Sequence, residues 1–398
     1  MAVLFFIVFI DLVGFGIVIP LLPFYAEHFG ASPDRVTLVM ASYSLAQFFF
    51  APLWGRLSDR FGRRPILLVS LVFSVASYLW LGFADALWML YGARLLAGAG
   101  AGNIAAAQAY VADVTPPEGR AKGMGLIGAA FGLGFTVGPA IGGLIAGSDP
   151  TAASVARPAF VAAALSAAAF IGTLLFLRES LTAGRHAARR PSRWRLAQDA
   201  FGRPALRQLL LLLFITLVAF AGMETTFALW AEGAFGWGPR QVGGIFFFVG
   251  IVLILVQGGL IGRLTKRFGE ARLLLAGSLA ITLGLVGLPF SHGLVAVLLA
   301  TALLALGMGL ANPSINSLIS RHARADQQGG ILGVAQAAGS LARIIGPAIA
   351  GAVFAAWGRN APYWLGAALM LAVVALALGV LRDEAGRAAV AAAPEQRP

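Results

Sequence analysis

The chain has 398 residues, of which 59% are hydrophobic and only 12% are charged, and its formal net charge is +12. Ordinary soluble domains carry about 25% charged residues, so this composition argues against a soluble globular protein. The sequence contains no cysteine, which excludes disulfide bonds, thiolate metal sites and thiol catalysis.

Apolar runs of membrane-spanning length recur along the whole sequence. Inside hydrocarbon every backbone polar group must be satisfied within the segment, so these runs are predicted to be helices. In chain order, the twelve predicted spans cover residues 2–25, 36–54, 66–84, 86–112, 122–146, 158–177, 207–231, 241–261, 272–290, 294–319, 328–356 and 361–381. The first run is too long for a signal-peptide core and contains Asp11, Pro20 and Pro23, so we expect it to remain as a span. The predicted fold class is an all-α membrane protein with twelve transmembrane helices.

The basic residues are distributed unevenly between the predicted loops. Most of the 29 lysines and arginines follow the even-numbered spans or lie in the tail, whereas the odd loops hold only Arg35, Arg157, Arg240 and Arg359. The positive-inside rule then puts the even loops and both termini in the cytoplasm. The basic excess therefore indicates topology and contact with anionic membrane lipids, and we expect no nucleic-acid partner.

The sequence is internally repeated. The segment GRLSDRFG at residues 55–62 recurs as GRLTKRFG at 262–269, and GPAI at 138–141 recurs at 346–349. Repeats of this kind indicate two homologous halves, here two six-helix bundles, at residues 1–178 and 207–381, that face each other across a central cavity. Between them, residues 179–206 form a polar linker that suits either a short helix on the membrane surface or a flexible segment. Residues 382–398 are expected to be a disordered tail.

Four motifs resemble those of a known family, and one of them is GFGIVIPLLP at residues 14–23, at the end of span one. The loop after span two, GRLSDRFGRRP at 55–65, fits the signature G-x-L-x-D-R-x-G-R-R of the major facilitator superfamily. Span five carries GFTVGPAIGG at 134–143, which fits the drug:proton antiporter signature G-x-x-x-G-P-x-x-G-G, and Arg94 in span four fits the arginine motif more loosely. Nearly the whole chain is similar to the twelve-helix drug:proton antiporters. Within them it resembles the tetracycline/proton antiporters through Asp11 before a glycine pair, ALWMLY at 86–91, FGW at 235–237 and QQG at 327–329. It departs from that group because span nine has no carboxylate and because Leu253 stands where some members have histidine.

The resemblance implies a secondary active transporter that exports lipophilic drug-like compounds, tetracycline-like or multidrug, in exchange for protons by alternating access. Two alternatives stay open, namely a porter of a lipid or an anionic metabolite on the same fold, and a passive facilitator or channel. We expect no enzymatic activity, cofactor or metal, because the sequence has no nucleophile or ligand cluster and no phosphate-binding loop. The resemblance also implies a monomer in the bacterial inner membrane, with a small-molecule substrate, protons and lipids as its partners.

Four charged residues lie within the predicted spans: Asp11 in span one, Arg94 in span four, Glu224 in span seven and Arg343 in span eleven. A charge at mid-membrane costs about 2.5–3.5 kcal/mol on insertion scales and usually faces a cavity, so these residues are candidates for proton coupling. The two carboxylates would bind and release a proton as the cavity changes sides, while the arginines stay charged and tune their partners. The alternative is a fixed ion pair that locks helices together.

Uncharged polar residues within the spans are candidates for orienting a substrate. They are Tyr43, Gln47, Asn103, Gln108, Gln257, Asn312, Asn316 and Gln336. The alternative for each is a hydrogen bond between helices, worth about 0.6 kcal/mol on average in membrane proteins.

The loop motif and span five supply candidates for gating: Gly55, Asp59, Arg60, Arg63, Arg64, Asp113, Gly138 and Pro139. Gly55 is expected to let span two approach span eleven, and Asp59 to accept from helix amides or to pair with Arg63. Asp113 is the expected partner of Arg60 or Arg63, so that the cluster holds the cytoplasmic side shut. The alternative is a solvated loop that only sets topology. Because Lys266 replaces Asp59 in the repeat, we expect a weaker lock in the second half.

Overall fold

The computed structural model describes residues 2–116, 120–148, 152–181, 193–324 and 327–392. Within these ranges every regular element is a helix and none is a strand. Eleven of the described helical segments are long and apolar enough to cross a membrane. The predicted all-α membrane fold is therefore confirmed.

The helices follow the predicted spans closely. The first seven spans are α1 (Ala2–Val18) with η1 (Ile19–Leu21) and α2 (Leu22–His28), α3 (Pro33–Phe61), α4 (Arg63–Gly82), α5 (Leu87–Ala99) with α6 (Asn103–Val114), α7 (Arg120–Ala146), α8 (Ala152–Phe176) and α10 (Pro204–Phe235). The remaining spans are α11 (Pro239–Leu255) with the π-helical turn η3 (Val256–Leu260) and α12 (Ile261–Phe268), α13 (Glu270–Gly287) with η4 (Leu288–Phe290), α14 (Leu294–His322), α15 (Gln328–Trp357) and α16 (Ala361–Ala392).

Span four is the predicted span that is missing from the eleven membrane-length segments of the described residues, because α5 and α6 are separated at residues 100–102. Each of the two pieces is too short to cross a bilayer alone. Gly100 and Gly102 allow the chain to pass close to large side chains here, since an added Cβ would collide with Phe73 at the first position and with Trp54 at the second.

The expected linker, residues 179–206, and the expected tail, residues 382–398, each contain some helix. Residues 193–202 of the expected linker form α9 (Arg193–Gly202), and residues 182–192 lie outside the described residues. Helix α16 continues past the last predicted span to Ala392, and residues 393–398 lie outside the description. The division into two halves with a linker and a tail stays a prediction.

The chain forms two compact units, each of which is described by itself. The first contains Met1–Arg190, Ala221–Ile251 and Arg343–Pro362, and the second contains Pro191–Phe220, Val252–Ala342 and Tyr363–Pro398. The first half of the sequence therefore lies in one unit, together with about half of α10, most of α11 and about half of α15.

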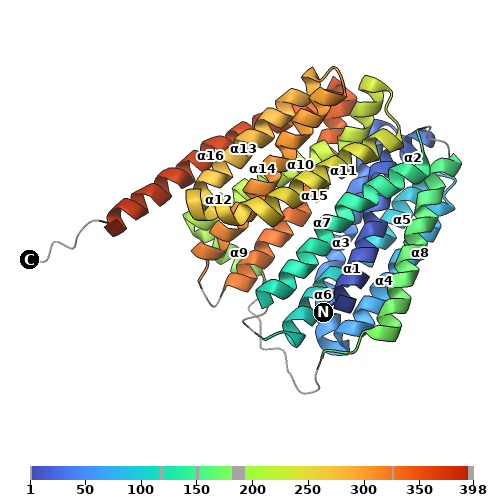
Figure 1. The fold of residues 1–398 in the computed structure, drawn as a ribbon, viewed down its shortest axis with the longest axis horizontal. Helices are drawn as coiled ribbons and strands as arrows, with labels where there is room; N and C mark the ends of the chain where they lie inside the picture. The colour runs from blue at the N-terminus through green and yellow to red at the C-terminus, as the bar shows by residue number, and fades with distance from the viewer. Residues whose placement is uncertain (1, 117–119, 149–151, 182–192, 325–326, 393–398) are drawn as a thin grey trace, which may run out of the picture. The chain divides into compact units, whose positions relative to one another are not determined.

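Helix α1 lies at the centre of the first half, where it packs extensively on both α7 and α8 (Figure 1). Its contact with α7 is close because glycines line it. An added Cβ at Gly138 would lie 2.7 Å from the Cα of Gly16, and one at Gly134 would lie 2.7 Å from the Cβ of Leu12. The antiporter-like motif of span five thus brings α7 against the helix that carries Asp11.

In the second unit, α13 and α14 form the most extensive helix pair. Gly277 and Gly307 face each other across it, since a Cβ at Gly277 would lie 2.8 Å from the carbonyl oxygen of Gly307. Small residues at such contacts let helix backbones approach closely, which is how helices associate in a bilayer.

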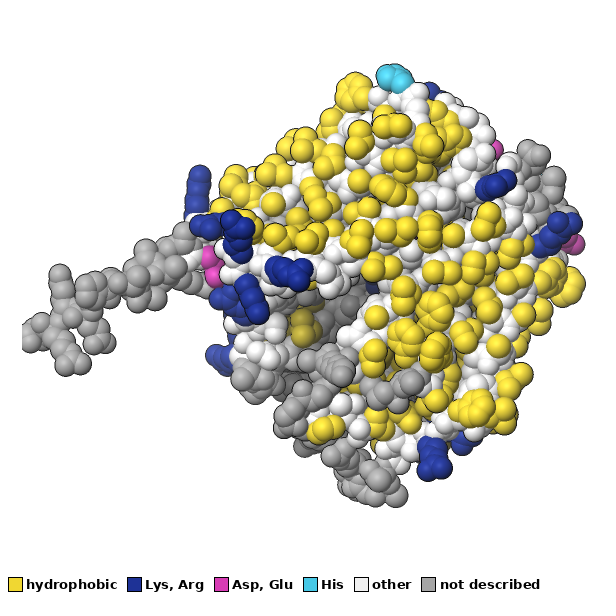
Figure 2. All heavy atoms as spheres, in the orientation of Figure 1, with side chains coloured by type: hydrophobic (Ala, Val, Ile, Leu, Met, Phe, Trp, Pro, Cys, Tyr) yellow, Lys and Arg dark blue, Asp and Glu magenta, His cyan; other side chains and the backbone are white. Residues whose placement is uncertain are grey.

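Large apolar side chains cover much of the outer surface, as the face in Figure 2 shows. Leu175, Leu283 and Leu371 are examples, each more than half exposed. A soluble protein rarely exposes continuous apolar surface on this scale, whereas lipid tails are a suitable solvent for it. The distribution agrees with a multi-pass membrane protein.

Candidate functional site

The break in span four is non-helical backbone within a predicted span, and side chains from neighbouring helices satisfy it. The indole Nε1 of Trp54 donates to the carbonyl oxygen of Ala99 at 2.5 Å. The hydroxyl of Ser70 donates to the carbonyl oxygen of Gly100 at 2.5 Å and accepts from the backbone N–H of Asn103 at 3.0 Å. Non-helical backbone at membrane depth persists only where such partners or water satisfy it. Helix α3 therefore holds the end of α5, and α4 holds the start of α6.

Asp11 lies against this start of α6. Its side chain is 5% exposed, the amide nitrogen of Asn103 donates to one carboxylate oxygen, and the hydroxyl of Ser166 donates to the other at 3.1 Å. Three helices, α1, α6 and α8, thus converge on one acid. In this structure Asp11 faces protein rather than an open cavity, because both carboxylate oxygens are engaged by side chains from neighbouring helices.

Ser166 was not among the sequence candidates. It lies 155 positions from Asp11 in a stretch of alanines, and a serine in that setting gives no local signal of contact with an acid. Asn103 was predicted as a substrate contact, but its side chain is occupied at both ends. The amide nitrogen binds Asp11, and the amide oxygen accepts from the backbone N–H of Ile104 at 2.8 Å.

Arg94 is buried, with 4% of its surface exposed, and it contacts aromatic rings instead of an acid. Its guanidinium carbon lies 4.6 Å from the ring centre of Tyr43 and 5.5 Å from that of Phe15. A cation over ring faces is attracted by their negative quadrupole, more strongly where water is excluded. Within the described residues its Nε has no hydrogen-bond partner.

Glu224 and Arg343 are half-buried on α10 and α15 in the first unit. Their charges act on each other, but among the described residues no ion pair within 4.0 Å joins them. The two residues are therefore electrostatic neighbours in this structure and do not form a fixed salt bridge.

The other predicted substrate contacts have varied surroundings. Tyr43, Gln47, Asn312 and Asn316 are half-buried, and the amide of Asn316 donates to the backbone and side-chain oxygens of Asn312 at 2.9 and 3.0 Å. Gln108, Gln257 and Gln336 are exposed. The structure does not collect the eight residues into one described pocket.

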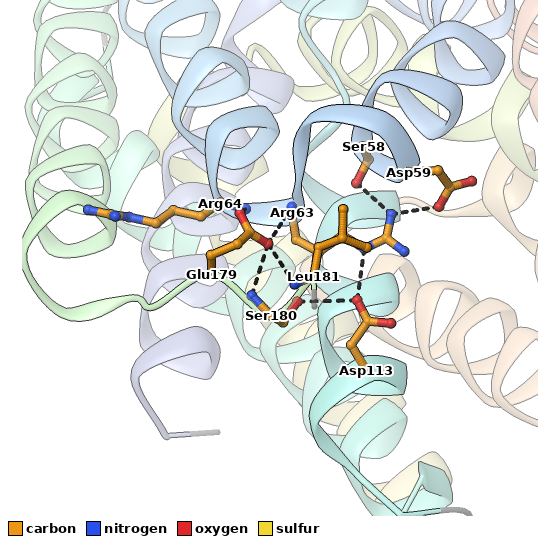
Figure 3. Close-up of polar contacts among 8 residues, drawn as sticks. All are labelled: Ser58, Asp59, Arg63, Arg64, Asp113, Glu179, Ser180 and Leu181. Atoms are coloured by element: carbon orange, nitrogen blue, oxygen red, sulfur yellow. Dashed lines mark hydrogen bonds and ion pairs between the residues drawn. The ribbon is translucent and has the colours of Figure 1, made fainter. Parts of the chain in front are cut away.

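The loop after span two forms a compact charged network centred on Arg63 (Figure 3). The guanidinium of Arg63 donates to Asp59 at 2.6 Å, to Asp113 at 2.9 Å and to the hydroxyl of Ser58 at 3.1 Å. Only 8% of the Arg63 side chain is exposed, so these contacts are largely shielded from water. Arg60 and Arg63 were the two partners expected for Asp113, and the structure pairs it with Arg63.

Glu179, which the sequence did not single out, completes this network (Figure 3). Its carboxylate accepts from the backbone N–H groups of Arg63 at 2.9 Å and Arg64 at 3.1 Å. These are the first two residues of α4, whose N–H groups have no partner within the helix. The segment after α8 therefore caps α4, and the side chain of Arg64 reaches back to the carbonyl oxygen of Leu174 at 2.7 Å.

The remaining gating candidates differ in their packing. Gly138 and Pro139 are buried, and Gly138 contacts α1 as described above. Arg60 is exposed and lies 5.2 Å from the ring centre of Phe61. At Gly55 an added Cβ would meet no atom within 4 Å, so the close approach expected at this glycine is not part of this structure.

Membrane-length helices, an internal repeat and buried ionisable side chains together define a multi-pass membrane transporter. The family model of the Major Facilitator Superfamily matches residues 4–347 and 259–397. The chain is 34% identical over 375 residues to the class C tetracycline resistance protein of Escherichia coli, covering 91% of this chain and 92% of the relative. The chain belongs to the Major Facilitator Superfamily.

Two further relatives cover most of the chain. Multidrug resistance protein 2 of Bacillus subtilis (strain 168) is 29% identical over 360 residues, covering 87% of this chain and 86% of that protein. The crystal structure of the human organic anion transporter MFSD10 (TETRAN) matches with a TM-score of 0.72 and 25% identity, covering 94% of this chain and 98% of the other. These relatives are transport and resistance proteins, and the chain is a transporter of the same superfamily.

Proposed function

We propose that this protein is a proton-coupled exporter of lipophilic drug-like compounds, tetracycline-like or multidrug. The observation that carries the proposal is Asp11, a buried carboxylate in span one that accepts from Asn103 and Ser166. The similarity to resistance proteins along nearly the whole chain supports the substrate class.

Protonation of Asp11 changes the contacts around it. An ionised carboxylate only accepts hydrogen bonds, and here it accepts from both Asn103 and Ser166. A protonated carboxyl group donates one hydrogen bond and accepts fewer, so the two donors must rearrange. Because Asn103 is the first residue of α6, this rearrangement reaches the break in span four.

Alternating access supplies the second step of the proposed coupling, after the protonation of Asp11. Asp11 is almost fully buried in this structure, so it exchanges protons with water only after the surrounding helices move. In our proposal the six-helix halves rock about a central site, as in other transporters with repeated halves. Arg94, Glu224 and Arg343 tune the charge balance of that site, and the exposed glutamines Gln108, Gln257 and Gln336 contact the substrate.

The loop network gates one end of the pathway. Arg63 joins α3, α4 and α6 through Asp59 and Asp113, and we propose that it holds the cytoplasmic end while that end is shut. The positive-inside distribution supports cytoplasmic termini. The similarity to bacterial resistance proteins supports a location in the bacterial inner membrane.

The first test identifies substrates. A drug-sensitive bacterium that expresses the protein is grown against a panel of toxic compounds that includes tetracyclines. We expect protection against at least one lipophilic compound. No protection against any compound, with the protein present in the membrane, contradicts the export function.

The second test addresses coupling. In inverted vesicles, Asp11→Asn is expected to abolish proton-driven uptake of the protecting compound while exchange between substrate pools continues. The matched control is Asp85→Asn, which changes an exposed acid outside the helices. Unchanged proton-driven uptake in Asp11→Asn refutes the coupling role, and a lack of counterflow in the unmodified protein indicates a channel.

One observation favours a second candidate, a porter of organic anions. Arg94 is a buried cation whose Nε lacks a partner among the described residues, and a related protein of known structure is named an organic anion transporter. Competition by organic anions in the same vesicle assay separates the two candidates, because a lipophilic-cation or neutral-drug exporter is not inhibited by them.

A further inference from the structure

The second half has a charged cluster of its own, formed by the start of α13, the end of α14 and a residue of α16. Arg321 donates to Glu270 at 2.9 Å, and the hydroxyl of Ser317 donates to the other oxygen of the same carboxylate at 3.1 Å. A second carboxylate, Glu384, lies 3.8 Å from Arg321. None of these residues was a candidate from the sequence.

This cluster occupies the same place in its half as the Arg63 network does in the first. Arg63 is the first residue of α4 and Glu270 the first residue of α13, and each follows a glycine with positive φ, 106° at Gly62 and 78° at Gly269. Their partners also correspond. Asp113 is the last residue but one of α6, and Arg321 is the last but one of α14. The two ion pairs have the same length, 2.9 Å.

The charges are exchanged between the halves. Arg63 pairs with Asp113 in the first half, whereas Glu270 pairs with Arg321 in the second. The sequence repeat shows a third exchange, since Lys266 occupies the position of Asp59. The expectation that Lys266 weakens the second lock stays a prediction, and the described bonds of Glu270 are to Ser317 and Arg321.

Helix dipoles explain why the exchanged pair needs fewer partners. The N-terminus of a helix favours a negative charge and its C-terminus a positive one. Glu270 and Arg321 satisfy both preferences, whereas Arg63 and Asp113 oppose both. The first half compensates with Glu179, whose carboxylate caps the start of α4.

We propose that Glu270 and Arg321 form a second gating clamp, which holds the ends of spans nine and ten together and is the charge-exchanged counterpart of Arg63–Asp113. This proposal rests on the alternating access proposed above. The Arg321 side chain is 55% exposed, so the pair is screened by water and adds little to overall stability. The pair therefore acts by positioning the helix ends. Its removal should change the opening of the gate more than it changes the stability against unfolding.

The test uses the absence of native cysteines. A single cysteine replaces Gln257, which is exposed on the turn η3 of span eight, and its rate of reaction with a water-soluble thiol reagent is measured in inverted vesicles. Glu270→Arg and Arg321→Glu are expected each to raise this rate by about threefold, the scale of one exposed ion pair. The double exchange Glu270→Arg/Arg321→Glu is expected to restore the original rate.

Two outcomes overturn the proposal. One is an unchanged labelling rate in both single variants, and the other is a double variant that labels as fast as the single ones. Thermal unfolding of the purified variants separates gating from folding, because a purely structural pair would lower the unfolding midpoint without changing the labelling rate. Glu270→Gln provides a milder variant if the charge reversal prevents folding. Labelling needs no transported compound, so a failure of the proposed substrate class leaves this test readable.

Discussion

The contact between α1 and α7 makes a prediction whose size follows from the structure. An added Cβ at Gly138 would lie 2.7 Å from two backbone atoms of Gly16 and 2.8 Å from the carbonyl oxygen of Val13. These are backbone atoms that cannot rotate away, so Gly138→Ala must separate the two helices. Overpacking of this kind costs about 1–3 kcal/mol.

The same helix offers a matched control. At Gly125 an added Cβ meets no atom within 4 Å, so Gly125→Ala changes only helix propensity, which favours alanine by about 0.5–1 kcal/mol. Because both glycines lie in α7, this gain is common to both variants and cancels when they are compared. Gly138→Ala is therefore expected to be less stable than Gly125→Ala by about 1–3 kcal/mol.

A third variant separates packing from a local proline effect. Gly138 precedes Pro139, and a residue with a Cβ before proline disfavours helical backbone, which adds to the cost at this position. Gly134 does not precede proline, yet a Cβ there would lie 2.7 Å from that of Leu12. We expect Gly134→Ala to be destabilised as well, by repulsion from α1 alone.

The assay is thermal or denaturant unfolding of the three purified variants in detergent, combined with transport in vesicles. Transport is expected to fall in Gly138→Ala and Gly134→Ala, since α1 carries Asp11, and to persist in Gly125→Ala. If the first two variants are as stable as the third, then α1 and α7 do not pack as described and the reasoning fails.

Three further predictions concern the hydrogen bonds of individual side chains. Asn103→Ala leaves the buried Asp11 with one donor fewer, a loss of about 1.5–3 kcal/mol for the ionised form, and vesicle uptake should fall. The control Thr173→Ala, whose hydroxyl bonds within its own helix, should retain uptake. Glu179→Gln weakens the cap of α4 and is expected to lower the free energy of unfolding, measured by denaturant titration, by about 1 kcal/mol. An unchanged free energy of unfolding contradicts the capping role. Trp54→Phe removes the donor to Ala99 and is expected to cost about 1–3 kcal/mol in the same titration, and a cost near zero means that water satisfies this carbonyl.

The predicted features that rest on local sequence agree with the structure. Helix positions follow from apolar runs, because a helix in hydrocarbon satisfies its own backbone and needs no distant partner. The all-α class and the family membership follow from these runs and from contiguous motifs such as residues 55–65. The contact of Arg63 with Asp113 was anticipated as one of two choices, since the start of α4 and the end of α6 lie on the same side of the predicted membrane.

Other features depend on which helix faces meet, and no local pattern encodes that. Asp11 was identified as an unusual acid from its position in an apolar run, but its partners Asn103 and Ser166 lie 92 and 155 positions away. Arg94 faces Tyr43 and Phe15 rather than an acid because of how α5 packs against α1 and α3. The sequence by itself determined the helices and the charges they carry. Only the tertiary structure decided the pairing of those charges, because packing over long sequence separations selects among several partners that local chemistry allows equally.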